Sequence, residues 1–143
     1  MAENNKFTLN FLSYSQNEAF ARSVVSCFAL GLNPNVSELS DIKTAVSEAV
    51  TNCIVHAYPD GVGEITLEGE IDGDDLHINV IDNGVGIDNL DDALEPFFTT
   101  RPDEERSGMG FTIMKSFMDD VKVETSKGKG TCVYMLKKLK ADR

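Results

Sequence analysis

DIKTAVSEAVTNCIVHAY, residues 41–58, is the segment around which the rest of the chain is organised. Its apolar residues recur at steps of three and four, which predicts a helix with one buried stripe. That stripe consists of Ile42, Val46, Ala49, Val50, Cys53 and Ile54. On the neighbouring face Glu48, Asn52 and His56 follow one another at steps of four, so that a carboxylate, an amide and an imidazole line up. Because a purely structural helix more often exposes pairs of Lys and Glu there, we expect this face to carry chemistry.

Length and composition predict a single globular domain that covers residues 1–143. No apolar run approaches the roughly 18 residues of a membrane helix, and the first residues lack a secretory pattern, so we expect a cytoplasmic protein without a membrane anchor. The 13 basic and 24 acidic residues give a net charge of −11, which disfavours direct binding to nucleic acid. Cys27, Cys53 and Cys132 are widely spaced among apolar neighbours, which predicts free, buried thiols.

The apolar pattern along the whole chain predicts elements in the order βααββ, loop, αββ. The predicted strands cover residues 6–12, 64–71, 76–81, 121–125 and 131–139, and the predicted helices cover residues 17–32, 37–58 and 110–118. The economical arrangement of these elements is an α+β fold. We expect a two-layer α/β sandwich in which helices cover one face of a mixed, mostly antiparallel sheet.

The same pattern gives local predictions for the first two helices. The first should expose Arg22 and turn its longer apolar residues toward the core. The residues expected to face inward are Phe20, Val24, Cys27, Phe28 and Gly31. For the second helix, Ser37 is the expected N-cap, because a Ser side chain there accepts a hydrogen bond from a free N–H group of the first turn.

Between residues 82 and 110 the sequence becomes irregular and rich in Gly, Pro and Asp, which is typical of a lid or a binding loop. This loop begins with Asp82-x-Gly84-x-Gly86, where glycines allow close approach of a ligand and the carboxylate can accept a hydrogen bond from an amino group. It ends with Gly108-x-Gly110 ahead of a helix, where free N–H groups suit a phosphate. Taken alone, each motif is also explained by ordinary turn chemistry or a flexible helix entry.

The polar row of the second helix suits phosphate chemistry. Asn52 offers an amide oxygen of the kind that Mg²⁺ accepts beside water and phosphate oxygens. Glu48, one turn away, could take a proton from a hydroxyl or a water that attacks a phosphate. We expect His56 to form a structural hydrogen bond, because no second His or Cys lies at metal spacing, and we expect His77 to be an ordinary polar residue of a strand.

The order and spacing of these motifs resemble the N, G1, G2 and G3 boxes of the GHKL ATPase superfamily, whose members share the Bergerat-type ATP-binding fold. The matching boxes are Glu48-x3-Asn52, Asp82-x-Gly84-x-Gly86, Gly108-x-Gly110 and Gly130-Thr131. The strings SEAVTNCIVHAY, DNGVGI, PFFTTRPDEERSGMGFTIM and FMDDV look more narrowly like the anti-sigma factor serine kinases. They are most similar to the branch that acts on a sporulation sigma factor of the sigma F type. The resemblance covers almost the whole chain.

The resemblance implies a protein-serine kinase that binds ATP and Mg²⁺ and holds a sigma factor of the sigma F type inactive. It also implies that an anti-anti-sigma factor is the phosphorylation substrate and that the protein is a homodimer. By position, Glu48 would be the catalytic base and Asn52 the Mg²⁺ ligand. Asp82 would read adenine, Thr131 would be a second adenine contact, and Arg22 would bind a partner protein.

The resemblance assigns the remaining ATP contacts to the glycine boxes and to an ATP lid, which is expected at about residues 88–108. These contacts are Gly84, Gly86, Thr99, Thr100, Arg101, Arg106, Ser107, Gly108, Met109, Gly110 and Phe111. The chain departs from the family at Ala57, where relatives often have Gly, and at Arg101, where Lys is frequent. Neither departure is disabling, since Ala is the better helix former and Arg keeps the charge.

The sequence leaves a second function open, a non-catalytic module of the same fold. In such a module ATP would only order the lid and thereby form or hide a surface for a partner protein, which requires no turnover. A third function, the catalytic half of a histidine kinase, is disfavoured. No helical hairpin with an acceptor His precedes the motifs in this chain.

Overall fold

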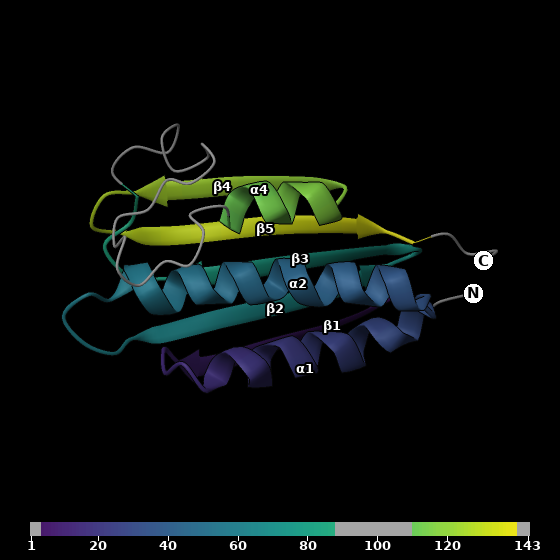
Figure 1. The fold of residues 1–143 in the computed structure, drawn as a ribbon, viewed down its shortest axis with the longest axis horizontal. Coiled ribbons are helices and arrows are strands. Elements are labelled where there is room, and N and C mark those ends of the chain that lie inside the picture. The colour runs from purple at the N-terminus through teal and green to yellow at the C-terminus, as the bar shows by residue number, and fades with distance from the viewer. Residues whose placement is uncertain (1–3, 88–109, 140–143) are drawn as a thin grey trace.

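A five-stranded sheet forms one layer of the protein in the computed structural model, which describes residues 4–87 and 110–139 (Figure 1). The strands are β1 (Asn5–Leu12), β2 (Glu64–Asp72), β3 (Asp75–Asp82), β4 (Asp120–Ser126) and β5 (Gly130–Lys138). Their spatial order is β1-β2-β3-β5-β4, and each neighbouring pair is antiparallel. The expected two-layer α+β sandwich is confirmed, and its five strands are antiparallel throughout rather than mixed.

Helices cover one face of this sheet, with α2 lying between α1 and α4 (Figure 1). The helical layer consists of α1 (Asn17–Ala29) with the 3₁₀ turn η1 (Leu30–Leu32), α2 (Val36–Asn52) with the π-helical turn η2 (Cys53–Ala57), and α4 (Gly110–Phe117). None of the helices within residues 4–87 and 110–139 is long and apolar enough to cross a membrane.

The core lies between α2 and the hairpin of β2 and β3. Residues on the helix-facing side of β2 and β3 alternate with exposed or half-buried ones, as the period of a strand requires. The predicted stripe of α2 packs against them, and Ile42, Val46 and Val50 are fully buried. Because each such side chain contributes about 1.5–3 kcal/mol on burial, α2 is anchored by its apolar stripe, and its polar row stays at the rim.

Helix α1 faces the core with a different stripe from the one predicted. Ala21, Val25 and Ala29 are fully buried, whereas Phe20 is 48% exposed and Cys27 is exposed. The two stripes lie side by side on the helix, and small Ala side chains let α1 approach the layer beneath it more closely than a row of large residues would. The prediction that all three cysteines are buried is therefore wrong for Cys27.

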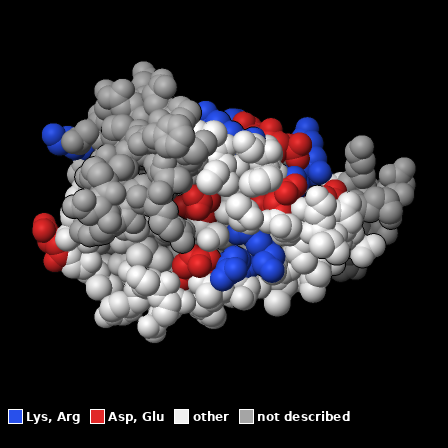
Figure 2. Space-filling view, in the orientation of Figure 1, with Lys and Arg blue, Asp and Glu red and all other residues white. Residues whose placement is uncertain are grey.

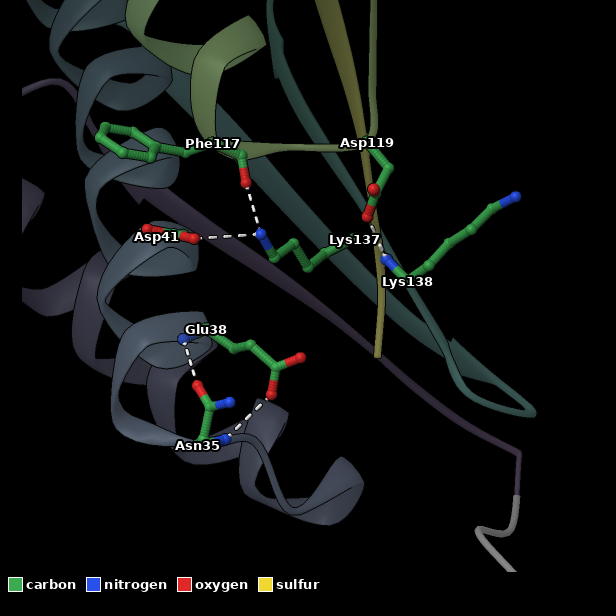
Figure 3. Close-up of polar contacts among 7 residues, drawn as sticks. All are labelled: Asn35, Glu38, Asp41, Phe117, Asp119, Lys137 and Lys138. Carbon is green, nitrogen blue, oxygen red and sulfur yellow. Dashed lines mark hydrogen bonds and ion pairs between the residues drawn. The ribbon is translucent and has the colours of Figure 1, made fainter. Parts of the chain in front are cut away.

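The N-cap of helix α2 is Asn35 and not the predicted Ser37. The Asn35 side chain accepts a hydrogen bond from the Glu38 N–H at 2.7 Å, and Glu38 Oε1 accepts one from the Asn35 N–H at 3.0 Å (Figure 3). This reciprocal pair is a capping box, which satisfies two donors that the helix itself leaves free. Ser37 already belongs to the first turn, because the helix starts at Val36.

Lys137 joins β5 to two helices from below the helical layer. Its amino group lies 3.2 Å from Asp41 Oδ2 of α2 and donates to the Phe117 carbonyl, the last of α4, at 2.6 Å (Figure 3). The side chain is only 13% exposed, so solvent screens this ion pair weakly. Lys137 thus satisfies a carbonyl that α4 leaves free and fixes that end of the helix on α2.

Replacing Asn35 with Ala should lower the free energy of unfolding by about 1 kcal/mol, because one capping partner is lost. Urea unfolding followed by circular dichroism measures the change. Ser37→Ala is the matched control, and we expect it to stay within about 0.5 kcal/mol of the wild type because Ser37 is not the cap. A larger effect at Ser37 than at Asn35 would contradict the observed start of α2.

Candidate functional site

The end of α2, the end of β3 and the beginning of α4 meet at one edge of the helical layer. Gly110, the first residue of α4, lies directly against Asn52, the last residue of α2. A Cβ atom on Gly110 would be 3.1 Å from Asn52 Nδ2 and 3.2 Å from Oδ1, closer than side chains normally pack. The structure therefore brings Asn52 of the first predicted box to Gly110, the described residue of the third, with the Asn52 amide beside the start of α4.

Asp82 ends β3 on the side that faces the helices. It is 5% exposed, and its two oxygens have different donors. The Gly84 N–H donates to Oδ1 at 2.9 Å, and the Cys53 thiol donates to Oδ2 at 3.3 Å. A carboxylate buried at this depth is destabilised unless donors replace its lost water, and these two bonds meet part of that requirement.

The loop after β3 is fastened to the π-helical turn η2. The Val85 N–H donates to the Ala57 carbonyl at 2.9 Å. A Cβ atom on Gly84 would overlap this same carbonyl oxygen, so only Gly allows the approach. A π-helical turn widens the helix end and frees carbonyls for bonds outside the helix, a geometry that often marks functional sites. The second predicted box is thus in backbone contact with the turn that follows the first box.

Tyr58 is a site residue that our sequence reasoning missed. Its hydroxyl donates to the Glu64 carbonyl at 2.6 Å and accepts from the Asn83 N–H at 2.9 Å. Partial burial raises the pKa of Tyr58, although the Asn83 N–H opposes this, so the hydroxyl keeps the proton that it donates. The only signal in the sequence was the position of Tyr58 at the end of the polar helix.

The turn between β4 and β5 closes the site from the other side. Thr131 lies opposite Asp82 in the β3–β5 register, and a Cβ atom on Gly130 would overlap the Asp82 carbonyl. Gly86 packs in the same way against the Ser126 carbonyl, and both glycines have positive φ, 98° for Gly130 and 77° for Gly86. The second and fourth predicted boxes therefore share one backbone junction.

Thr125 of β4 strengthens this junction and was also missed. Its hydroxyl oxygen accepts from the Ile87 N–H at 2.9 Å and lies 2.9 Å from the Thr131 hydroxyl oxygen. A Thr on a strand gives no sequence signal of its own. Its role depends on register, since Thr125 is the cross-strand partner of Thr131.

Glu48 and Arg22 lie apart from this junction. Both line an open groove of about 410 Å³ between α1 and α2, and Lys43 lines it too. Arg22 Nε is 3.0 Å from Glu18 Oε2 on the same helix, and the two side chains are only partly exposed, 39% for Arg22 and 23% for Glu18. On this face of the molecule a small group of basic side chains stands beside acidic ones (Figure 2). Glu48 is one helical turn before Asn52, so it lines the end of the groove that is nearer to the site.

Several predicted contacts lie outside the described residues, and the structure gives no account of them. They are Thr99, Thr100, Arg101, Arg106, Ser107, Gly108 and Met109, together with the lid predicted at residues 88–108. Phe111 is described, and its side chain is 8% exposed and belongs to the hydrophobic core. If Phe111 contacts a nucleotide, its backbone must do so.

The described residues suit a cation that is held mainly by its ligand. No group of three or more His, Cys, Asp and Glu side chains within residues 4–87 and 110–139 could form a metal site of its own. Mg²⁺ commonly takes one or two oxygens from a protein and the rest from phosphate and water, so the single amide oxygen of Asn52 fits such an ion.

His77 Nδ1 lies 2.7 Å from the Tyr134 hydroxyl, a structural contact as expected.

Comparison with known proteins gives consistent matches over most of the chain. The sequence profile of the histidine kinase-like ATPase domain matches residues 14–137. The anti-sigma F factor of Thermoanaerobacter sp. (strain X514) is 54% identical over 143 residues, with all of both chains covered. The anti-sigma F factor of Clostridium acetobutylicum is 54% identical over 134 residues, 94% of each chain.

A solved structure shares the fold. The RsbU and RsbW domains of a Mycobacterium tuberculosis protein superimpose with a TM-score of 0.68 at 16% sequence identity. The match covers 94% of this chain and 32% of that longer one. At this identity the likeness concerns the arrangement of helices and strands alone.

Replacing Gly84 with Ala should force the loop away from the Ala57 carbonyl. We expect a loss of about 1–3 kcal/mol in the free energy of unfolding, the usual cost of an overpacked site. Urea unfolding measures it, and Gly61→Ala is the matched control because a Cβ atom there meets nothing within 4 Å. Equal stability of the two variants would show that the contact between the loop and η2 is not as close as described.

Proposed function

The chain belongs to the histidine kinase-like ATPase family, in the branch of the anti-sigma F factors, and from this we propose that it is an ATP-dependent protein-serine kinase that also sequesters a sigma factor. Its substrate would be a serine of an anti-anti-sigma factor, its cofactors ATP and Mg²⁺, and its place of action the cytoplasm. The observation that carries the proposal is that Gly110 packs against Asn52 at the end of α2 while Asp82 accepts a hydrogen bond from Cys53, the next residue.

In the proposed function the site binds the two ends of a nucleotide with different groups. The Asp82 carboxylate accepts hydrogen bonds only, so it favours a base with an amino group, such as adenine. Gly110 begins α4, and the first turn of a helix has free N–H groups and a positive dipole end that suit phosphate. Bound Mg²⁺ would neutralise phosphate charge during transfer, and the Asn52 oxygen is the described group that can hold it.

Glu48 is the proposed acceptor of the proton that the reaction releases. It lies one helical turn from Asn52 and lines the groove that opens toward solvent between α1 and α2. In the proposed mechanism Glu48 accepts the proton of the incoming serine hydroxyl as that oxygen bonds to the terminal phosphorus of ATP, while the bond from this phosphorus to the bridging oxygen breaks and ADP leaves. The rest of catalysis is positioning, since phosphoryl transfer asks little covalent chemistry of a protein.

The groove between α1 and α2 is also the proposed place for protein partners. Arg22 lines it, and Arg22 is the position that resembles a partner-binding residue of the family. The names of the relatives, anti-sigma F factors, support a sigma factor of that type as one partner. The homodimer that the family resemblance implies stays a prediction.

Replacing Glu48 with Gln should reduce phosphate transfer by roughly 10²–10⁴-fold, the usual contribution of a general base, while ATP binding persists. Transfer of labelled γ-phosphate to the cognate anti-anti-sigma factor measures the first effect, and isothermal titration calorimetry measures the second. Glu70→Gln, an exposed site on β2, is the control and should transfer normally. Wild-type transfer by Glu48→Gln would remove Glu48 from this role, and no transfer by the wild type would favour a non-catalytic module.

Replacing Asp82 with Asn should lower the preference for ATP over GTP by roughly ten- to hundredfold, because the neutral amide no longer offers two charged acceptor oxygens. Competition binding with the two nucleotides measures the ratio. Asp72→Asn, at the exposed far end of β2, should leave it unchanged. If the ratio survives in Asp82→Asn, another group reads the base.

A further inference from the structure

The buried carboxylate of Asp82 depends on a small number of donors. Within residues 4–87 and 110–139 it forms no ion pair, and its described donors are the Gly84 N–H and the Cys53 thiol. An ionised carboxylate has about four lone-pair positions. The protein therefore supplies one described donor to each oxygen, which leaves acceptor capacity on both.

Cys53 is held rigidly enough to direct its thiol. It is the first residue of η2 and is 4% exposed, and its N–H donates to the Ala49 and Val50 carbonyls. The thiol sulfur lies 3.3 Å from Asp82 Oδ2, and both residues are buried, so the thiol is in position to donate to the carboxylate.

We propose that Cys53 is a positioning residue for base recognition. Its thiol donates to Asp82 Oδ2 while the Gly84 N–H donates to Oδ1, and together they fix the plane in which the carboxylate meets the amino group of adenine. This inference rests on the proposed function, because that function assigns Asp82 to the base.

The position of Cys53 in the chain adds a second consequence. Cys53 follows Asn52 directly, and the two side chains contact different ends of the site. The Asn52 side chain lies against the start of α4, and the Cys53 thiol donates to Asp82 at the end of β3. One turn of helix thus sets the distance between the group that reads the base and the group that holds the cation. The same turn is the junction between α2 and η2.

A simpler role for Cys53 is that of a small apolar residue that fills the core. Three substitutions separate the two roles. Cys53→Ala and Cys53→Val remove the donor, and Val does so while filling the space, whereas Cys53→Ser keeps a donor of similar size. Cys132→Ala is the matched control, since the Cys132 thiol is half-buried and pairs weakly with Asn79, at 3.7 Å.

The experiment compares ATP with inosine triphosphate, which has a carbonyl in place of the 6-amino group, by calorimetric titration of the full chain. We expect Ala and Val at position 53 to lower the preference for ATP by roughly three- to tenfold, the range of one modest hydrogen bond. Ser at that position and the Cys132→Ala control should keep it. A wild-type preference in the Ala and Val variants, or an equal loss with Ser, would overturn the proposal.

A second measurement does not require nucleotide. The S–H stretching band that disappears in Cys53→Ser should lie at lower frequency than the band of the exposed Cys27, and it should rise in Asp82→Asn as the acceptor weakens. A band at the frequency of Cys27 would overturn the hydrogen bond itself. If this band is as expected but the wild type does not prefer ATP, the assignment of Asp82 to the base fails, and the positioning role falls with it.

Discussion

The hydrogen bond from the Val85 N–H to the Ala57 carbonyl is the contact on which the site depends. It joins the loop after β3 to the π-helical turn that ends α2, and it forms only because Gly84 has no side chain to strike that carbonyl. With the loop held against η2, the Gly84 N–H can donate to Asp82 Oδ1. A buried carboxylate, a helix end and a strand end are therefore placed by one backbone contact between segments far apart in the sequence.

Helix α2 supplies both the core of the fold and the polar groups of the site. Its apolar stripe is buried against the sheet, so its direction is set by tens of close contacts and not by its polar residues. Asn52 is therefore held in place as part of a packed helix. At the opposite end of α2, Lys137 joins α4 to the same helix. Catalytic groups on such elements keep their geometry better than groups on loops do.

The sequence was informative where periodicity decides a structure. The alternation of β2 and β3, the stripe of α2 and the order of the elements within the described residues agree with the structure, because burial of one face gives a regular pattern of apolar residues along the chain. The sequence was less informative where two alternative local structures differ little in free energy. The inward face of α1 depends on how closely Ala21 and Ala29 let it pack, and the helix start depends on Asn35 meeting Glu38.

The sequence by itself determined the fold class, the family and the residue types of the candidate site, because the motifs Glu48-x3-Asn52 and Asp82-x-Gly84-x-Gly86 are local patterns that can be recognised without the fold. Only the tertiary structure decided which groups touch. Cys53, Tyr58 and Thr125 act through partners that lie 29, 25 and 38 residues away, and no local pattern records such a contact. The physical reason is that hydrogen bonds across elements depend on register and on backbone approach, which arise only when the two layers have packed.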